Sequence, residues 1–339
     1  MRKIVKVAFC DWWKEFDCYN NFIIDAIQKE MECVVVNRPE EAEFVFCSIF
    51  GYEYLNYSCP RIVFSGENCI PDFNSFDYGI GFDYLSIGDR YYRYPLYLAC
   101  YQDDCEKMIR GANLTREEAI SREFCAMVVS NSEFADPMRD MIFDAISKYK
   151  KVASGGKYRN NIGNENGVTC KEEFIKKYKF SLACENSSHR GYCTEKLIQA
   201  FAYGTVPIYW GDPDVEIYFN KDAFINVNRF TSLYELCKFV IKLDSDNEQY
   251  IKMLNAPKIV NPDYELTSME NKFADWICKI VCQPVLLAYR RNRYGWVLNN
   301  EKNIMENKNK LEKMNQIEQK ISKWRYRLEK IPQKVLMHK

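Results

Sequence analysis

The amino-acid sequence predicts an α/β protein with two parallel sheets that face each other across a cleft, followed by a helical tail. Its 339 residues are enough for two domains of ordinary size, each with its own core. Short apolar runs alternate with stretches of helical periodicity in both halves, which is the pattern of parallel sheets crossed by helices. From about residue 296 this alternation stops, and one long, charged, amphipathic stretch begins.

We expect the first domain to cover residues 1–150. Its early strands are rich in Val, Ile and Phe and are too short for helices, which is typical of buried strands. Residues 19–31 carry apolar side chains at helical spacing between the first two strands. A later strand at 123–132 and a helix at 137–150, with Pro137 at a typical helix start, complete the domain. The early strands are predicted at 4–10, 33–36, 44–50 and 61–66.

A loop rich in Gly and Asn, residues 151–168, marks the start of a second domain, which we expect to cover residues 151–295. Its apolar runs again alternate with helical stretches, so a second parallel sheet is predicted. Two such domains leave a cleft that the carboxyl ends of the strands face, and there we expect the chemistry. Strands are predicted at 180–186, 205–211 and 223–228, and helices at 194–203, 232–243 and 247–254.

The tail, residues 296–339, is predicted to be a helix with one apolar stripe and an excess of basic residues near its end. Such a stripe packs on the protein's own surface, forms a coiled coil that would make a homodimer, or lies on an anionic membrane. The sequence leaves these three alternatives open. The stripe consists of Met314, Ile317, Ile321, Trp324, Leu328, Ile331 and Val335. The basic residues are Lys320, Lys323, Arg325, Arg327, Lys330, Lys334 and Lys339, against Glu329 alone after residue 319.

Composition argues against several classes of function and location. The 47 basic residues equal the 47 acidic ones in number, so the charge balance indicates no nucleic acid or other polyanionic partner. The 15 cysteines are odd in number and irregular in spacing, and the apolar run at the N-terminus is too short for a signal peptide. We therefore expect reduced thiols in a cytoplasmic protein. Because no apolar stretch approaches the roughly 20 residues that span a bilayer, no transmembrane anchor is expected.

The sequence contains few residues of the types that form a metal site or act as a catalytic histidine. The chain has 2 histidines, and its cysteines form no Cys-x-x-Cys pair. Three pairs of nearby aspartates could bind a divalent ion, but short aspartate clusters more often cap helices or close turns. We expect turns there and no metal site, while stimulation by a divalent cation stays open. The pairs are Asp103 with Asp104, Asp212 with Asp214, and Asp244 with Asp246.

A dense polar cluster between the predicted strand at 180–186 and the predicted helix at 194–203 is the main candidate site. Free backbone N–H groups and the positive end of a helix dipole at such a place suit a phosphate. Lys196 lies in the first turn, where a cation is unfavourable unless an anionic ligand binds; a solvated lysine is the alternative. Arg159 in the interdomain loop is a second cation for a diphosphate, or else an ordinary surface arginine.

A carboxylate is expected to face the same cleft from the first domain. The predicted strand at 61–66 runs directly into Glu67, which places this side chain at the carboxyl end of a strand. There it would oppose the polar cluster of the second domain. On the pattern alone, a glutamate that caps a turn is the alternative.

Three segments resemble the α-1,3-fucosyltransferase family, glycosyltransferase family 10, in its bacterial type. The segment ENSSHRGYCTEKLIQAFAYGTVPIYWGDPDVEIYFNKDAFINV, which begins at Glu185, resembles the signature region of that family. VFSGENCIPDFNSFDYGIGFDYL, from Val63, is similar to its N-terminal motif, and ASGGKYRNNIG, from Ala153, to its interdomain segment. The resemblance implies a GT-B fold with two Rossmann-like domains, in which the second holds the donor GDP-fucose and the acceptor approaches from the first.

The resemblance also implies roles for individual residues. Two cations would neutralise the diphosphate of GDP-fucose, and three polar side chains would line the pocket for its ribose, its fucose or both. Glu67 would be the general base, and Glu195 is the other carboxylate that could be proposed for this role. No cofactor or metal is required by this arrangement. The cations are Arg159 and Lys196, and the polar residues are Asn186, Tyr192 and Glu195.

The implied activity is inverting transfer of L-fucose from GDP-β-L-fucose to the GlcNAc hydroxyl of a Galβ1-4GlcNAc-type acceptor, with an α-1,3 linkage and a Lewis X-like product. The acceptor would belong to a surface glycan such as lipopolysaccharide, and the enzyme would work in the bacterial cytoplasm. Its basic tail would then attach it peripherally to the inner face of the cytoplasmic membrane. The alternatives are a non-catalytic protein of the same fold that binds nucleotide sugars or glycans, and an enzyme that uses another donor.

Overall fold

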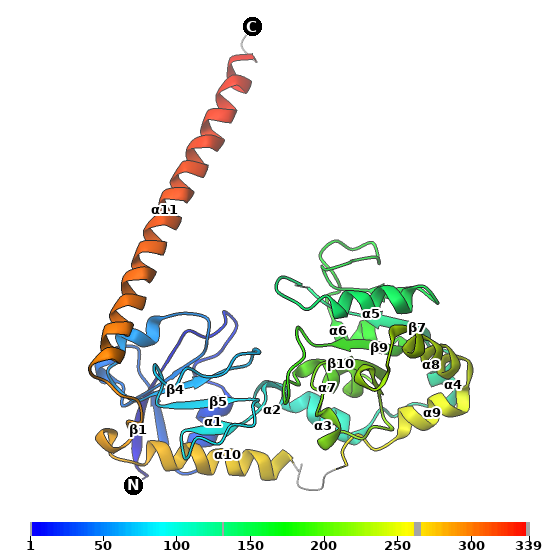
Figure 1. The fold of residues 1–339 in the computed structure, drawn as a ribbon, viewed down its shortest axis with the longest axis horizontal. Helices are drawn as coiled ribbons and strands as arrows, with labels where there is room; N and C mark the ends of the chain where they lie inside the picture. Colours follow the sequence, from blue (N-terminus) through cyan, green and yellow to red (C-terminus); the bar gives the residue numbers. More distant parts are fainter. Residues whose placement is uncertain (1, 131, 261–265, 337–339) are drawn as a thin grey trace.

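The chain folds into two α/β domains that lie side by side, with one long helix projecting from the first (Figure 1). The computed structural model describes residues 2–130, 132–260 and 266–336, with side chains described up to residue 321 except at 312, 315 and 319. Strands pair in parallel throughout both sheets, so the expected α/β class with two parallel sheets is confirmed.

The first sheet has six strands. In spatial order they are β2 (Glu32–Val35), β1 (Ile4–Cys10), β3 (Phe44–Cys47), β4 (Arg61–Phe64), β5 (Tyr78–Gly81) and β6 (Tyr91–Arg93). Every residue of β3, β4 and β5 is buried, because both faces of a parallel sheet are covered. On one face lies α1 (Phe22–Gln28), which directs Ile23, Ile24 and Ile27 into the core.

The second sheet has five strands. In spatial order they are β11 (Ile225–Asn226), β10 (Val206–Trp210), β9 (Tyr178–Cys184), β7 (Glu123–Met127) and β8 (Val152–Ser154). The central strand β9 is buried along its whole length, and its side chains alternate between two cores. Ala183 packs with α7 (Glu195–Ala202), whereas Phe180 and Leu182 pack with α5 (Met138–Ser147) and α8 (Leu233–Ser245).

The border between the domains lies earlier in the chain than the sequence suggests. β7 and α5 fall within the expected first domain, residues 1–150, but β7 pairs with β8 and β9 of the second sheet. Later, α10 (Leu266–Val281) returns to the first domain, where Phe273 stacks on Tyr94 with 4.2 Å between ring centroids. The expected domains, 1–150 and 151–295, are therefore wrong at these borders, because apolar periodicity identifies an element but not its packing partner.

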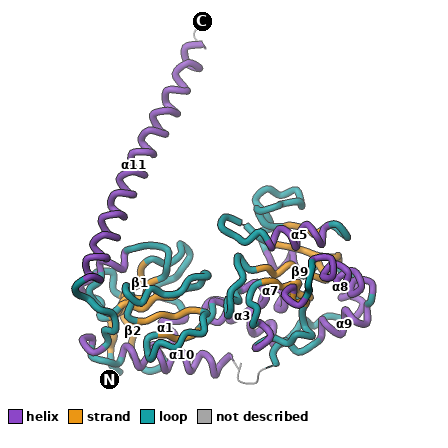
Figure 2. Tube along the Cα trace, viewed as in Figure 1, coloured by secondary structure: helices purple, strands orange, loops and turns teal. Residues whose placement is uncertain are grey.

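The chain thus crosses twice between the domains. At the first crossing α2 (Leu96–Cys100) packs in the core of the first domain, and α3 (Gln102–Arg110) packs against α7 of the second. At the second, α10 packs against α1 of the first domain (Figure 2). The remaining helices and 3₁₀ turns are η1 (Pro39–Glu41), η2 (Glu53–Asn56), α4 (Arg116–Ile120), α6 (Lys171–Ile175), η3 (Val215–Ile217), η4 (Val227–Arg229), α9 (Asn247–Asn255) and η5 (Val285–Leu287).

The predicted tail forms one helix, α11 (Trp296–Leu336), which leaves the body of the protein (Figures 1 and 2). Its base is anchored on the first domain, because the buried guanidinium of Arg61 donates to Glu301 Oε1 at 2.5 Å. Lys308 forms a second ion pair, with Glu53 of η2. Among the residues that the structure describes, no helix combines the length and apolar character needed to cross a bilayer.

The apolar stripe of the tail is uncovered where its side chains are described. Met314, Ile317 and Ile321 are 57%, 55% and 49% exposed. Packing on the protein's own surface is therefore wrong for these three residues, and the coiled coil and the membrane remain as alternatives. The other members of the predicted stripe, Trp324, Leu328, Ile331 and Val335, lie outside the described side chains.

Candidate active site

Two adjoining cavities lie where strands of the two sheets end. The first, which we call the interdomain cavity, measures about 290 Å³ and is lined by loops that follow β4, β7 and β9 and by the start of α7. It brings together five of the six predicted site residues. These are Glu67, Asn186, Tyr192, Glu195 and Lys196.

The helix α7 begins at this cavity because of a buried carboxylate. Glu185, directly after β9, is fully buried and accepts hydrogen bonds from Thr194 N at 2.8 Å and from Thr194 Oγ1 at 2.5 Å. Thr194 is the N-cap residue, but its hydroxyl serves Glu185 instead of the backbone of the helix. Glu185 thereby positions the first turn of α7, which carries Glu195 and Lys196. No local pattern in the sequence singles out Glu185.

Lys196 is held between two carboxylates. Its Nζ lies 3.0 Å from Glu185 Oε2 and 3.3 Å from Glu195 Oε1, and its side chain is 18% exposed. Burial by itself would lower the pKa of Lys196, but the two carboxylates outweigh burial and raise this pKa above its usual value. Burial also opposes the charge of Glu195, yet Lys196 and Lys171 lower the pKa of this carboxyl. Lys196 is therefore a fixed cation, and the alternative of a freely solvated lysine is wrong.

Two further cations, which the sequence analysis missed, line the same cavity. Arg139, in the first turn of α5, is 2% exposed and donates from Nη1 to Asn186 Oδ1 at 3.1 Å. Lys171, at the start of α6, donates to Gln199 Oε1 at 2.6 Å, and burial lowers its pKa. Each is a lone basic residue at the start of an ordinary helix. Its position just after a strand or loop is the only feature of the local sequence that could have identified it as a site residue.

Arg159 packs on α5 and not into the interdomain cavity. Its guanidinium pairs with Asp144, lies 3.4 Å from Asp140 Oδ1, and covers the Phe143 ring at 4.5 Å. The two aspartates stand one helical turn apart on the same face of α5, which makes this face attractive for an arginine. The structure therefore places Arg159 outside the interdomain cavity, contrary to the prediction, and Arg139 lines this cavity instead.

Glu67 faces the three cations from the first domain, as predicted. It lies in an exposed loop after β4, and its Oε2 accepts a hydrogen bond from Tyr192 OH at 3.1 Å across the cleft. Tyr192 is 1% exposed, and burial raises the pKa of its hydroxyl, so this group acts as a hydrogen-bond donor. Next to this pair, Asn68 Nδ2 donates to Ser187 Oγ at 2.6 Å. These contacts join the loop of Glu67 to the second domain.

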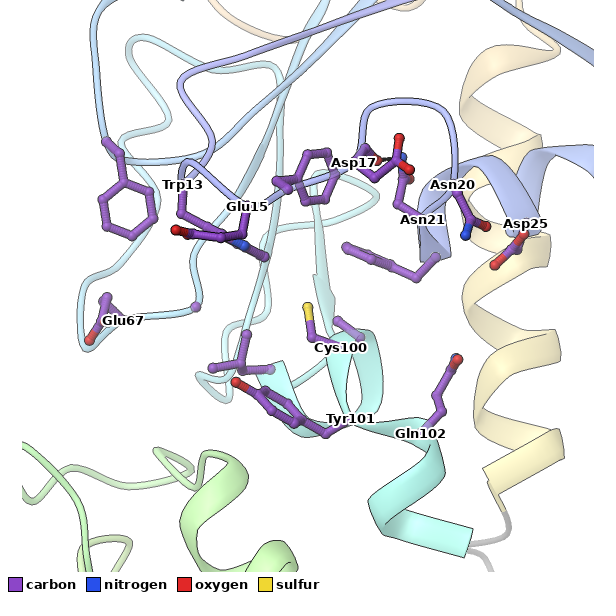
Figure 3. A pocket seen from close by; sticks show the side chains of 16 residues that line it. Trp13, Glu15, Asp17, Asn20, Asn21, Asp25, Glu67, Cys100, Tyr101 and Gln102 are labelled. Atoms are coloured by element: carbon purple, nitrogen blue, oxygen red, sulfur yellow. Dashed lines mark hydrogen bonds between the residues drawn. The ribbon is translucent and has the colours of Figure 1, made fainter. Parts of the chain in front are cut away.

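The second cavity, which we call the N-domain cavity, measures about 690 Å³ and adjoins the first (Figure 3). Glu67 and Tyr101 line both cavities. Figure 3 shows these two residues near the second domain, and Asn20 and Asp25 on the opposite side, at the start of α1. The walls of the N-domain cavity come from the loop after β1, from α1, and from the crossing at α2 and α3. No local sequence pattern reveals that these segments lie close together.

Two of the aspartates serve a turn and a cap, as expected, whereas Asp244 pairs with Lys150 and Lys179. Asp212 closes a turn by accepting hydrogen bonds from Gly191 N and Asp214 N, each at 2.8 Å. Asp246 caps α9 by accepting from Gln249 N at 3.0 Å. In the parts of the chain that the structure describes, no three His, Cys, Asp or Glu side chains are grouped so that they could hold a metal ion.

Known proteins resemble this chain over both domains. The α-(1,3)-fucosyltransferase FucT N-terminal domain model matches residues 7–101, and the glycosyltransferase family 10 (fucosyltransferase) C-terminal model matches residues 120–301. The second match begins just before β7, in agreement with the border that the sheets show. The α-(1,3)-fucosyltransferase FucT of Helicobacter pylori is 31% identical over 288 residues, which cover 74% of this chain and 59% of that protein.

Shorter and structural matches point the same way. The 4-galactosyl-N-acetylglucosaminide 3-alpha-L-fucosyltransferase 9 of Mus musculus is 42% identical over 82 residues, which cover 24% of this chain and 23% of that protein. Crystal structures of an α1,3-fucosyltransferase with GDP and with GDP-fucose each have a TM-score of 0.72 and 27% identity, and cover 86% of this chain and 93% of theirs. The expected GT-B fold is confirmed. With its two matched domains and this shared fold, the chain belongs to glycosyltransferase family 10, the fucosyltransferase family.

Proposed function

We propose that this protein is an inverting α-1,3-fucosyltransferase that moves L-fucose from GDP-β-L-fucose to an oligosaccharide acceptor. The observation that carries the proposal is one cavity in which three cations of the second domain stand opposite Glu67 of the first. A sugar nucleotide brings a diphosphate to such a site and an acceptor brings a hydroxyl, and the two sets of groups serve these two needs. The match spans 59% of the length of the H. pylori relative, so the proposal rests on the site as well as on the kinship.

The donor diphosphate would lie against Arg139, Lys171 and Lys196 at the N-terminus of α7. The planar guanidinium of Arg139 suits two phosphate oxygens at once, and the lysines act as point charges. Together they would stabilise the negative charge that develops on the leaving phosphate as the glycosidic bond breaks. The residues proposed for the ribose and the fucose are Asn186, Tyr192 and Glu195.

This assignment separates the two arginines. We expect Arg139→Ala to weaken GDP-fucose binding by about 10- to 100-fold, since it removes charge-assisted hydrogen bonds to the diphosphate. Arg159→Ala should leave the affinity nearly unchanged, because the partners of Arg159 are aspartates of α5. Isothermal titration calorimetry with GDP-fucose measures both, with circular dichroism as a check on folding. A larger loss in Arg159→Ala than in Arg139→Ala would contradict the assignment.

We assign Glu67, and not Glu195, as the general base. Conversion of a β-linked donor into an α-linked product calls for a single displacement, in which one carboxylate takes the proton of the attacking hydroxyl. Glu67 lines both cavities, so it can meet an acceptor in one and the donor in the other. Glu195 lies 3.3 Å from Lys196 and has a lowered pKa, which makes it a weak base. Its charge would instead support the oxocarbenium-like transition state.

The proposed acceptor group is the GlcNAc hydroxyl of a Galβ1-4GlcNAc unit on a surface glycan such as lipopolysaccharide, which gives an α-1,3 linkage and a Lewis X-like product. The mouse relative is, by its name, a 3-α-L-fucosyltransferase of a 4-galactosyl-N-acetylglucosaminide. The N-domain cavity beside Glu67 supplies room for such an acceptor, since its volume of about 690 Å³ lies within the usual range of ligand pockets.

Acceptor-dependent release of GDP from GDP-fucose tests the proposal, with N-acetyllactosamine as the acceptor. We expect release that needs the acceptor and a product that carries α-1,3-linked fucose, identified by NMR. Binding of GDP-fucose without release, over a panel of β-galactoside acceptors, would favour a non-catalytic protein of this fold. Release of the nucleotide from another sugar nucleotide, with no release of GDP from GDP-fucose, would favour an enzyme that uses another donor.

We expect the reaction to require no metal cofactor, because three side-chain cations are available for the leaving diphosphate. The enzyme should keep most of its activity in EDTA, and added Mg²⁺ or Mn²⁺ should at most stimulate it. The measurement is the rate of GDP release after exhaustive chelation. Activity that disappears in EDTA and returns with Mn²⁺ would show that a metal does what we assign to these cations.

We further propose that the protein is cytoplasmic and that its basic tail attaches it peripherally to the inner face of the membrane, with a homodimer through the tail as the alternative. We expect removal of residues 312–339 to abolish binding to vesicles that contain anionic lipid, because the basic residues and much of the apolar stripe lie there. Flotation measures this binding, and vesicles of neutral lipid serve as the control. Unchanged flotation together with a change from dimer to monomer in sedimentation would favour the homodimer.

A further inference from the structure

We propose that the N-domain cavity selects uncharged acceptors, and that Glu15 and Asp25 are specificity-determining residues that reject acceptors carrying a carboxylate, sulfate or phosphate. The inference rests on the proposed transfer to an oligosaccharide and adds the class of oligosaccharide that is used.

The cavity is placed to receive the part of the acceptor that does not react. Four residues line both cavities, so the two volumes meet at the proposed base. An acceptor whose hydroxyl reaches Glu67 must therefore extend away from the donor, and the N-domain cavity is the adjoining space. The shared residues are Gly66, Glu67, Leu96 and Tyr101.

The walls of the cavity suit a sugar. Trp13 and Phe50 stand at 90° to each other with 6.4 Å between ring centroids, and Phe50 is 55% exposed. Exposed aromatic rings of this kind bury the apolar face of a pyranose and leave its hydroxyl groups free for hydrogen bonds. The amides of Asn20 and Gln102 line the same cavity and both donate and accept hydrogen bonds.

The charges of the lining are all of one sign. Its ionisable side chains with a charge at neutral pH are four carboxylates, and the described lining contains no Lys, Arg or His. Glu15 and Asp25 are exposed, and neither has an ion-pair partner in the part of the chain whose side chains are described. Figure 3 shows Glu15 beside Trp13, and Asp25 on α1 at the far side of the cavity from Glu67. An anionic group on the part of the acceptor that lies in this cavity would thus approach a carboxylate, and no Lys, Arg or His of the described lining would offset the repulsion.

The contrast with the interdomain cavity supports this reading. There Arg139, Lys171 and Lys196 stand beside the carboxylates of Glu67 and Glu195, whereas the adjoining N-domain cavity has only acidic charges. Carboxylates accept hydrogen bonds from neutral hydroxyl groups, so the same residues that repel anions favour an uncharged glycan. The two cavities therefore sort an anionic nucleotide from a neutral acceptor by charge.

Kinetics on matched acceptors test the proposal. We compare kcat/KM for GDP release with N-acetyllactosamine and with its 3′-sialylated, 6′-sialylated and sulfated forms. The parent should prefer the neutral acceptor by about tenfold or more, mainly through KM. The Glu15→Gln/Asp25→Asn double variant should narrow this preference several-fold, and so should high salt, which screens the repulsion. Glu32→Gln, an exposed carboxylate of β2 outside the cavity, is the matched control and should leave the preference unchanged.

Two results would overturn the proposal: equal kcat/KM for neutral and anionic acceptors in the parent, or a preference that the double variant leaves intact. Saturation-transfer NMR of the same glycans with the GDP-bound protein gives a second readout that needs no turnover. Selective binding of the neutral glycan without GDP release would contradict the proposed transferase activity and support the charge selection. Equal GDP release with all acceptors would support the transferase activity and contradict the charge selection.

Discussion

Glu67→Gln should lower kcat for acceptor-dependent GDP release by about 10²- to 10⁴-fold, the usual contribution of a general base. The amide keeps nearly the shape of the carboxylate and can still accept the hydrogen bond that Tyr192 OH donates at 3.1 Å. It cannot take a proton from the acceptor hydroxyl. Because Glu67 lies across the cleft from the three cations, GDP-fucose should bind the variant with little change in Kd.

Single-turnover measurement of GDP release and calorimetric titration of GDP-fucose check this expectation together. Glu40→Gln is a suitable control, since it changes an exposed glutamate of η1 outside both cavities. Near-parental turnover in Glu67→Gln would remove Glu67 from the chemistry and return attention to Glu195. A loss of donor affinity as large as the loss of turnover would make Glu67 a donor-binding residue.

Lys196→Met should abolish GDP-fucose binding and also destabilise the protein. Lys196 is the partner of Glu185, which is fully buried, and removal of one member of a buried ion pair costs about 3–5 kcal/mol of unfolding free energy. Burial raises the pKa of Glu185 above its usual value. In the variant the buried carboxyl of Glu185 is tolerated when it is protonated. The free energy of unfolding of the variant, relative to that of the parent, should therefore increase as pH falls and decrease as pH rises through the raised pKa of Glu185.

A second variant separates the fold from the function of Lys196. Lys196→Met/Glu185→Gln should recover much of the lost stability, because the buried charge is gone and the amide can still accept from Thr194 N. It should not recover donor binding, since the cation for the diphosphate is still missing. Urea unfolding at several pH values and titration with GDP-fucose give the two answers. Restored binding of GDP-fucose in the double variant would mean that Lys196 acts only by shaping the start of α7. Lys177→Met, which changes an exposed lysine, is the control for the loss of one positive charge.

Local patterns were sufficient for most elements and for the groups at their ends. The helix expected at 194–203 is α7, and the strand expected at 205–211 is β10, because each has its own apolar period and is bounded by residues that end it. The same reasoning located Glu67 at the end of β4 and Lys196 in the first turn of α7. The short strands β5 and β6 were missed, since runs of this length among aromatic and glycine residues carry little period.

The arrangement of charges could not be predicted in the same way. Arg139 and Arg159 are both single arginines in polar surroundings, and only the docking of a loop on α5 sends Arg159 to Asp140 and Asp144. Glu185 looks like a polar residue at the end of a strand, yet its burial beneath Thr194 and Lys196 makes it the group that positions the first turn of α7.

The sequence by itself determined the α/β class, the family and five of the six candidate site residues, because these follow from short motifs and from the ends of single strands and helices. The tertiary structure decided that β7 joins the second sheet, that α10 returns to the first domain, and that Arg139 and Lys171 replace Arg159 in the cavity. It also decided the shape and the charge of the N-domain cavity. These features depend on contacts between residues far apart in the chain, which no local period records.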